Sequence, residues 1–94
     1  MAVVSEVRDL GRHVGESVTV RGWVDTKRSH GKVAFLVVRD GTGIVQNVLV
    51  RNQVSAEDWD AFESLTQESS VRVTGTVRAE PRAPGGYEMA LEKL

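Results

Sequence analysis

The sequence predicts a small all-β domain with helices, in which five short strands form a barrel. Three observations support this fold class. Apolar and polar residues alternate along the predicted strands, as in strands that bury one face. Turns rich in glycine and proline separate these strands. Between residues 55 and 65 the large apolar residues recur instead at helical spacing, which predicts one helix between the third and fourth strands.

The first two elements are a short N-terminal helix and a strand. Ser5 is the candidate N-cap of a helix that runs to about His13 and acts as a lid. Its apolar face would contain Val7, Leu10 and Val14. The first strand begins at about Ser17 and points four residues inward: Val18, Val20, Gly22 and Val24. Gly22 predicts a bulge or sharp coil, as a strand that serves two sheets would need.

The second and third strands span about Lys32 to Arg39 and Ile44 to Arg51, joined by a tight turn at 40–43. Their inward rows are Ala34, Leu36 and Val38, then Val45, Asn47 and Leu49. An amide in a core row is unexpected. Either Asn47 has a hydrogen-bond partner near the end of the barrel, or a bulge shifts the alternation.

The predicted helix has Ser55 at its N-cap, Asp58 at N3 and a hydrophobic staple between Val54 and Trp59. Its apolar stripe is Trp59, Phe62 and Leu65, for which core packing is preferred over cofactor binding. The fourth strand points Val71, Val73, Gly75 and Val77 inward, and the fifth separates Tyr87, Met89 and Leu91 from Glu88, Ala90 and Glu92.

This order of elements is that of the five-stranded OB-fold barrel. Its binding surface is centred on the second and third strands and flanked by two loops, here at residues 29–31 and 80–86. A chain of 94 residues supports one core, so we expect a single domain over residues 1–94.

The composition excludes several classes of protein. With 40% hydrophobic and 27% charged residues, the chain is neither disordered nor membrane-embedded, and no apolar run reaches membrane length. It has no cysteine and no leader-like N-terminus, so we expect a cytoplasmic setting. The net charge is only −1, yet basic residues gather between Arg21 and Arg39 and acidic ones between Glu57 and Glu68. Such segregation would orient an RNA, although a merely solvated face is the alternative interpretation.

The outward row of the second strand carries Phe35, with Arg28, Lys32 and Arg39 nearby and Gln46 on the third strand. This combination suits a single-stranded base that is stacked and then hydrogen-bonded along its edge. Catalytic chemistry is not expected, because the chain has two histidines, no thiol and no metal-ligand spacing. We therefore expect a binding domain without enzymatic activity, cofactor or metal.

A family resemblance extends this interpretation. Gly22-Trp23-Val24, the basic turn ending in Gly31-Lys32, Phe35-Leu36, and Arg39-Asp40-Gly-Thr-Gly with Ile44-Val45-Gln46 resemble the N-terminal anticodon-binding domain of class IIb aminoacyl-tRNA synthetases. The stretches 67–69 and 83–88 favour the asparaginyl branch over the aspartyl one. The resemblance covers about residues 7–94. It implies an OB-fold that binds the tRNA anticodon loop, no membrane contact, and a homodimeric parent enzyme with a separate class II catalytic domain, the isolated domain being a monomer.

The resemblance also implies roles for individual residues. Phe35 would stack a central uridine, Gln46 would read its edge, and Arg28 would contact that base or a phosphate. Glu88 would accept from a guanine. Four cations would serve phosphates: Lys27, Lys32, Arg78 and Arg82. The alternatives are a strand residue packed under the N-terminal helix for Phe35 and a solvated glutamate for Glu88. For the whole domain they are a general single-strand-binding OB module and a protein-interaction or dimer-forming barrel.

Overall fold

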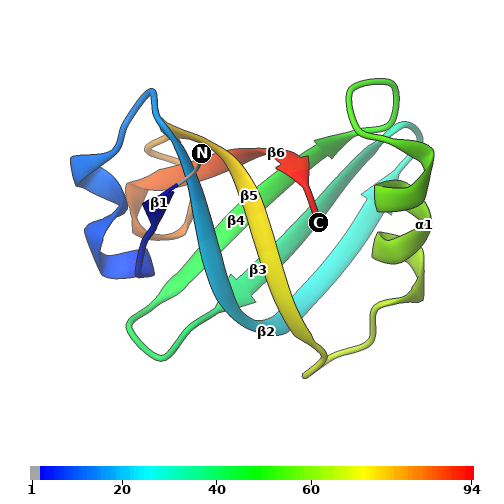
Figure 1. Ribbon diagram of the computed structural model, residues 1–94, viewed down its shortest axis with the longest axis horizontal. Helices are drawn as coiled ribbons and strands as arrows, with labels where there is room; N and C mark the ends of the chain where they lie inside the picture. The colour runs from blue at the N-terminus through cyan, green and yellow to red at the C-terminus, as the bar shows by residue number, and fades with distance from the viewer. Residues whose placement is uncertain (1–2) are drawn as a thin grey trace.

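The computed structural model describes residues 3–94, which form six strands, two 3-10 helices and one α-helix (Figure 1). The strands are β1 (Val3–Val4), β2 (Ser17–His30), β3 (Val33–Arg39), β4 (Ile44–Val50), β5 (Ser70–Ala79) and β6 (Tyr87–Lys93). The helices are η1 (Val7–Arg12), α1 (Ala56–Ser64) and η2 (Pro84–Gly86). No helix in this part of the chain has the length and hydropathy needed to cross a bilayer.

Five of the strands close into a barrel in the order β2-β3-β4-β6-β5, and β5 pairs back to β2. All pairings in this ring are antiparallel except that of β4 with β6, which is parallel. The helices η1 and α1 lie at opposite ends of the barrel, and α1 connects β4 to β5 (Figure 1). The predicted OB-fold arrangement is therefore confirmed.

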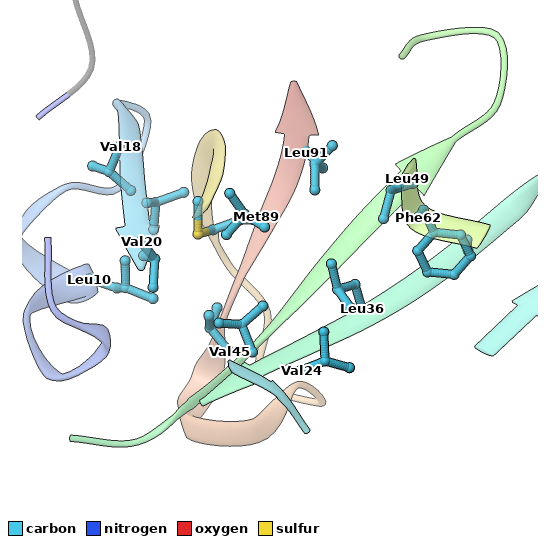
Figure 2. Packing of buried hydrophobic residues seen from close by; sticks show 14 of the residues in the cluster. Leu10, Val18, Val20, Val24, Leu36, Val45, Leu49, Phe62, Met89 and Leu91 are labelled. Atoms are coloured by element: carbon cyan, nitrogen blue, oxygen red, sulfur yellow. The ribbon is translucent and has the colours of Figure 1, made fainter. Parts of the chain in front are cut away.

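The core of the barrel consists of the predicted inward rows. Leu36, Val45 and Leu49 are fully buried, and the cluster extends from Leu10 of η1 to Phe62 of α1 (Figure 2). Asn47 is also fully buried, and its Nδ2 donates to the carbonyl oxygen of Leu36 at 3.0 Å. Of the two explanations for this core amide, the hydrogen-bond partner is correct.

The long strand β2 serves two neighbours, as expected, but its bulge is not at Gly22. Residues 17–23 pair with β5 and residues 23–30 pair with β3, and the register shift lies between Val24 and Thr26. Gly22 is needed for another reason. A Cβ there would lie 2.2 Å from the carbonyl oxygen of Arg39, so only glycine lets the two strands approach this closely.

The N-terminal segment differs from the prediction in two ways. The predicted helix is a 3-10 helix whose N-cap is Glu6, and Ser5 does not cap it, because the Ser5 hydroxyl donates to the neighbouring Glu6 carbonyl. Before it, β1 pairs in parallel with the start of β2, and this strand was not predicted. A strand of two residues has no alternation to detect.

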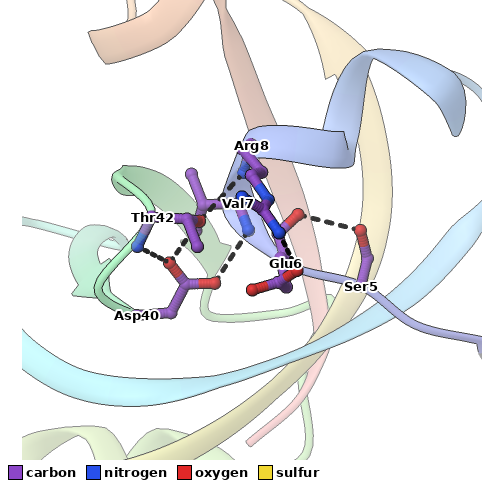
Figure 3. Close-up of polar contacts among 6 residues, drawn as sticks. All are labelled: Ser5, Glu6, Val7, Arg8, Asp40 and Thr42. Atoms are coloured by element: carbon purple, nitrogen blue, oxygen red, sulfur yellow. Dashed lines mark hydrogen bonds and ion pairs between the residues drawn. The ribbon is translucent and has the colours of Figure 1, made fainter.

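Asp40 joins η1 to the turn between β3 and β4 (Figure 3). Its Oδ2 accepts from the backbone N–H of Val7 at 2.8 Å, and its Oδ1 accepts from the backbone and hydroxyl of Thr42 at 2.9 and 2.7 Å. Burial alone would raise the pKa of Asp40, but these hydrogen bonds and one from the Gly43 backbone outweigh it, so the pKa lies below its usual range.

The helix α1 begins as predicted, with the Ser55 hydroxyl accepting from the backbone N–H of Asp58 at 3.0 Å. It ends at Ser64, so Leu65, the last residue of the predicted stripe, is the C-cap and lies just outside the helix. At this end Lys27 of β2 donates through Nζ to the carbonyl oxygens of Phe62 and Glu63, at 3.0 and 2.8 Å. The cation thereby interacts favourably with the last carbonyls at the negative end of the helix.

Candidate nucleic-acid interface

The strand register gathers the predicted base-contacting residues on one outer face. Arg28 of β2 pairs directly with Phe35 of β3, and Gln46 of β4 lies two residues from the partner of Phe35. Such diagonal neighbours on one face are about 7–8 Å apart. Gln46 in turn pairs with Glu88 of β6, and Glu88 pairs with Arg78 of β5. Five strands of the barrel thus contribute to one row of side chains.

Arg28 and Phe35 form a cation-π pair. The central guanidinium carbon of Arg28 is 4.6 Å from the centroid of the Phe35 ring. Phe35 is half-buried and Arg28 is exposed, so the pair presents two flat groups of different character at the surface. Both a phenyl ring and a guanidinium plane are surfaces on which a nucleic-acid base stacks.

Glu88 is buried, so the alternative interpretation of this residue as a solvated glutamate is wrong. The residue is 7% exposed, and both oxygens of its carboxylate accept hydrogen bonds. Nε of Arg78 donates to Oε1 at 2.6 Å, and Nε2 of Gln46 donates to Oε2 at 3.3 Å. No local pattern marks this contact, because its three members come from three strands.

The four predicted phosphate contacts occupy different environments. Arg78 is half-exposed and pairs with Glu88, and Lys27 is bound to the carbonyls of α1. Lys32 in the turn between β2 and β3, and Arg82 in the loop between β5 and η2, are both exposed. Neither side chain forms an ion pair with any residue in 3–94. The first expected loop, at 29–31, is shorter in the structure, because β2 continues to His30 and the turn is residues 31–32. Arg82 lies in the second expected loop, at 80–86.

Trp23 is an exposed aromatic residue for which the sequence predicted no role in binding. It is 45% exposed, and it pairs with Arg39 in the β2–β3 ladder, which places it on the same outer face as Phe35. The guanidinium carbon of Arg39 is 5.9 Å from its ring centroid, and Arg39 also forms an ion pair with Glu68. Alternation along the first predicted strand had already placed Trp23 on the outward side, and this position was the signal in the sequence that could have identified it as a surface aromatic residue.

The interface is an open face. A hollow of about 750 Å³ lies between β2, β5, α1 and Leu94, and Phe35, Gln46 and Glu88 are absent from its lining. No group of three or more acidic or histidine side chains within residues 3–94 is placed to hold a metal ion. An open face with flat groups and an amide suits extended single-stranded nucleic acid better than a small enclosed ligand.

Comparison with protein families matches residues 18–94 to the tRNA anti-codon family, described as an OB-fold nucleic acid binding domain. Among curated proteins, the chain is 54% identical over 93 residues to the asparagine–tRNA ligase of Koribacter versatilis and 51% identical over 88 residues to that of Desulforamulus reducens. These alignments cover 99% and 94% of the chain but 21% and 20% of the relatives. The chain therefore spans about a fifth of their length.

Comparison with solved structures also finds an asparaginyl-tRNA synthetase. The asparaginyl-tRNA synthetase from Pyrococcus horikoshii complexed with asparaginyl-adenylate is 41% identical with a TM-score of 0.88, and the match covers 99% of this chain and 22% of that one. An OBody bound to hen egg-white lysozyme is 27% identical with a TM-score of 0.76, covering 87% of this chain and 81% of the OBody. The same barrel thus occurs both within a long synthetase chain and as most of a short one.

Proposed function

Since the chain belongs to the tRNA anti-codon family of OB-fold nucleic acid binding domains, we propose that it binds the anticodon loop of a transfer RNA for an asparaginyl-tRNA ligase. The observation that carries this proposal is the Arg28–Phe35 pair, with the Gln46 amide one diagonal step away on the same face. This places a stacking surface beside a group that can both donate and accept hydrogen bonds.

In this proposal each residue has a separate task. Phe35 stacks the central uridine, Gln46 hydrogen-bonds its edge, and Arg28 contacts the base or the adjacent phosphate. Glu88 accepts from a guanine through the lone pairs that Arg78 and Gln46 leave free. Lys32 and Arg82 bind phosphates from the two flanking loops. Lys27 and Arg78 can do so only by exchanging or sharing the protein contacts that they already make.

The proposal for the parent protein rests on the curated relatives, of whose length this chain spans about a fifth. We propose a cytoplasmic, homodimeric asparaginyl-tRNA ligase with a separate class II catalytic domain. The present domain contributes binding and no catalysis.

A general single-strand-binding module is the second candidate, and exposed Trp23 favours it. Such proteins stack successive bases on several aromatic side chains, and Trp23 with Arg39 provides a second surface on the same face. The two candidates differ in sequence preference. Anticodon binding depends on the identity of the central base, whereas general binding tolerates any base that stacks.

Three variants of the chain test the proposal against anticodon stem-loops that differ only in the central base. Phe35→Ala should weaken binding of every loop by about 1–3 kcal/mol, the range for losing one base–aromatic stack. Gln46→Ala should remove mainly the preference for uridine over cytidine. Lys32→Ala should weaken all loops alike, because phosphates carry no sequence information.

The outcomes separate the candidates. If Gln46→Ala keeps the uridine preference while Lys32→Ala changes it, the assignment of this face to anticodon reading is wrong. If the unsubstituted chain binds loops with every central base equally and Trp23→Ala weakens binding as much as Phe35→Ala, the general single-strand-binding module is the better description.

A further inference from the structure

A glutamine side chain cannot by itself distinguish uracil from cytosine. Uracil presents an acceptor at O4 beside a donor at N3, and cytosine presents a donor at N4 beside an acceptor at N3. The terminal amide of glutamine carries one oxygen and one NH₂ group, so a half-turn exchanges a uracil-reading edge for a cytosine-reading one. The last torsion of a free glutamine is broad and roughly two-fold. Specificity therefore requires a group that holds the amide of Gln46 in one orientation.

Glu88 is placed to do this, and we infer that it is a positioning residue that holds the Gln46 amide in the uracil-reading orientation. This inference rests on the proposed function. The Glu88 carboxylate accepts a hydrogen bond from this amide, with Oε2 3.3 Å from Nε2 of Gln46. In its ion pair with Arg78 the carboxylate only accepts hydrogen bonds, so it selects the NH₂ group. A half-turn of Gln46 would bring two acceptor oxygens together.

Glu88 itself is held firmly. It is 7% exposed, and Arg78 donates through Nε to its Oε1 at 2.6 Å. Arg78, Glu88 and Gln46 are cross-strand neighbours on β5, β6 and β4, so backbone pairing determines their order. Within residues 3–94 the amide of Gln46 has no hydrogen-bond partner other than Glu88. Its oxygen and second N–H therefore stay available for a base.

The substitution Glu88→Gln tests the inference sharply, because it preserves the shape of the side chain and replaces one accepting oxygen with a donating NH₂ group. Nε of Arg78 can only donate, so the introduced amide turns its oxygen toward Arg78 and its NH₂ group toward Gln46. Gln46 must then turn its own oxygen inward and its NH₂ group outward. This orientation matches cytosine, so the preference between the two bases should invert.

The experiment measures affinities of the chain for stem-loops with central uridine or central cytidine. The unsubstituted chain should prefer central uridine over central cytidine by roughly 5- to 150-fold, the range for one bidentate base contact. In Glu88→Gln this ratio should fall to one or below, whereas loss of the proposed guanine contact should weaken both loops alike and leave the ratio unaffected. The matched control is Glu92→Gln on the same strand. Glu92 also accepts two hydrogen bonds, from Ser17 and Thr76, but does not contact Gln46, so this variant should keep the parent ratio.

The outcomes distinguish this inference from the function beneath it. If Gln46→Ala abolishes the uridine preference but Glu88→Gln keeps it while weakening both loops alike, the positioning role is wrong and the anticodon assignment stands. If the parent binds neither loop better than a scrambled hairpin, the proposed function itself fails.

A measurement on the unsubstituted chain tests the same inference if Glu88→Gln does not fold. In nuclear magnetic resonance spectra, the Glu88 carboxylate should shift one Nε2 proton of Gln46 downfield. Nuclear Overhauser effects should connect this proton to the Glu88 side chain. Gln46 amide protons at the positions of a free glutamine would overturn the inference.

Discussion

The Asp40 contact with η1 offers a test of how this fold is held together. Asp40→Asn keeps the shape of the side chain but replaces one accepting oxygen with an NH₂ group. If the remaining oxygen keeps the two contacts to Thr42, the new NH₂ group faces the backbone N–H of Val7, donor against donor. The lost hydrogen bond joins residues 33 positions apart in the sequence.

The loss of one hydrogen bond to a charged group costs about 1.5–3 kcal/mol. Asp40 is only half-buried, so the lower part of that range applies. We therefore expect Asp40→Asn to lower the free energy of unfolding at pH 7 by about 1.5–2 kcal/mol. For a domain of this size each kcal/mol corresponds to about 4–8 °C in Tm.

The pH dependence follows from the lowered pKa of Asp40. A carboxyl whose pKa is lower in the folded than in the unfolded state stabilises the fold at all pH values above its unfolded pKa, about 3.9 for aspartate. This stabilisation is lost as the pH falls through the folded pKa. The difference in unfolding free energy between the parent and Asp40→Asn should thus be constant from pH 7 to about pH 5 and shrink below pH 4.

Urea denaturation at pH 7, 5, 4 and 3 measures this difference. The control is Asp60→Asn, since Asp60 is exposed on α1 and its carboxylate accepts no hydrogen bond within residues 3–94. A difference below about 0.5 kcal/mol at pH 7, the usual scatter of surface substitutions, would show that this contact adds no stability. A difference unchanged at pH 3 would refute the link to the Asp40 carboxylate.

Three further predictions concern stability and binding. Gly75→Ala should destabilise the barrel by about 1–3 kcal/mol through overpacking, because its Cβ would lie 2.4 Å from the Ala90 carbonyl oxygen; an unchanged denaturation midpoint would contradict this. Ser55→Ala should lower the free energy of unfolding by about 1 kcal/mol, because it removes the cap on the Asp58 N–H. Circular dichroism melts measure this loss beside a Glu57→Gln control, and a loss no larger than that of the control would contradict the prediction. Stem-loop affinity should be modest and fall with added salt, because phosphate contacts release counterions; titrations at two ionic strengths that give equal affinities would exclude a phosphate-dominated contact.

Local patterns in the sequence were sufficient for much of the fold. Alternation with a period of two identified the inward row of β5 and placed Phe35 and Gln46 outward, since side-chain direction in a strand depends only on neighbouring residues. The Ser55 cap was predictable for the same reason, because its partner lies three residues away. The strand β1 is too short to carry such a pattern.

Contacts between distant segments could not be predicted in this way. The sequence marked Glu88 as a polar residue on a strand, and only the closed barrel brings Arg78 and Gln46 to its carboxylate. The family resemblance assigned Lys27 to phosphates, a prediction that no observation tests, and the structure adds its contact with the end of α1.

Local periodicity is enough to predict which side of each strand faces the core and which residue types reach the surface. Tertiary structure alone decided which outward residues are neighbours. That outcome depends on the register shift between Val24 and Thr26, on the parallel pairing of β4 with β6, and on closure of β5 against β2. A shift of one residue in any of these pairings would turn side chains to the opposite face, so the row from Arg28 to Arg78 exists only in the assembled barrel.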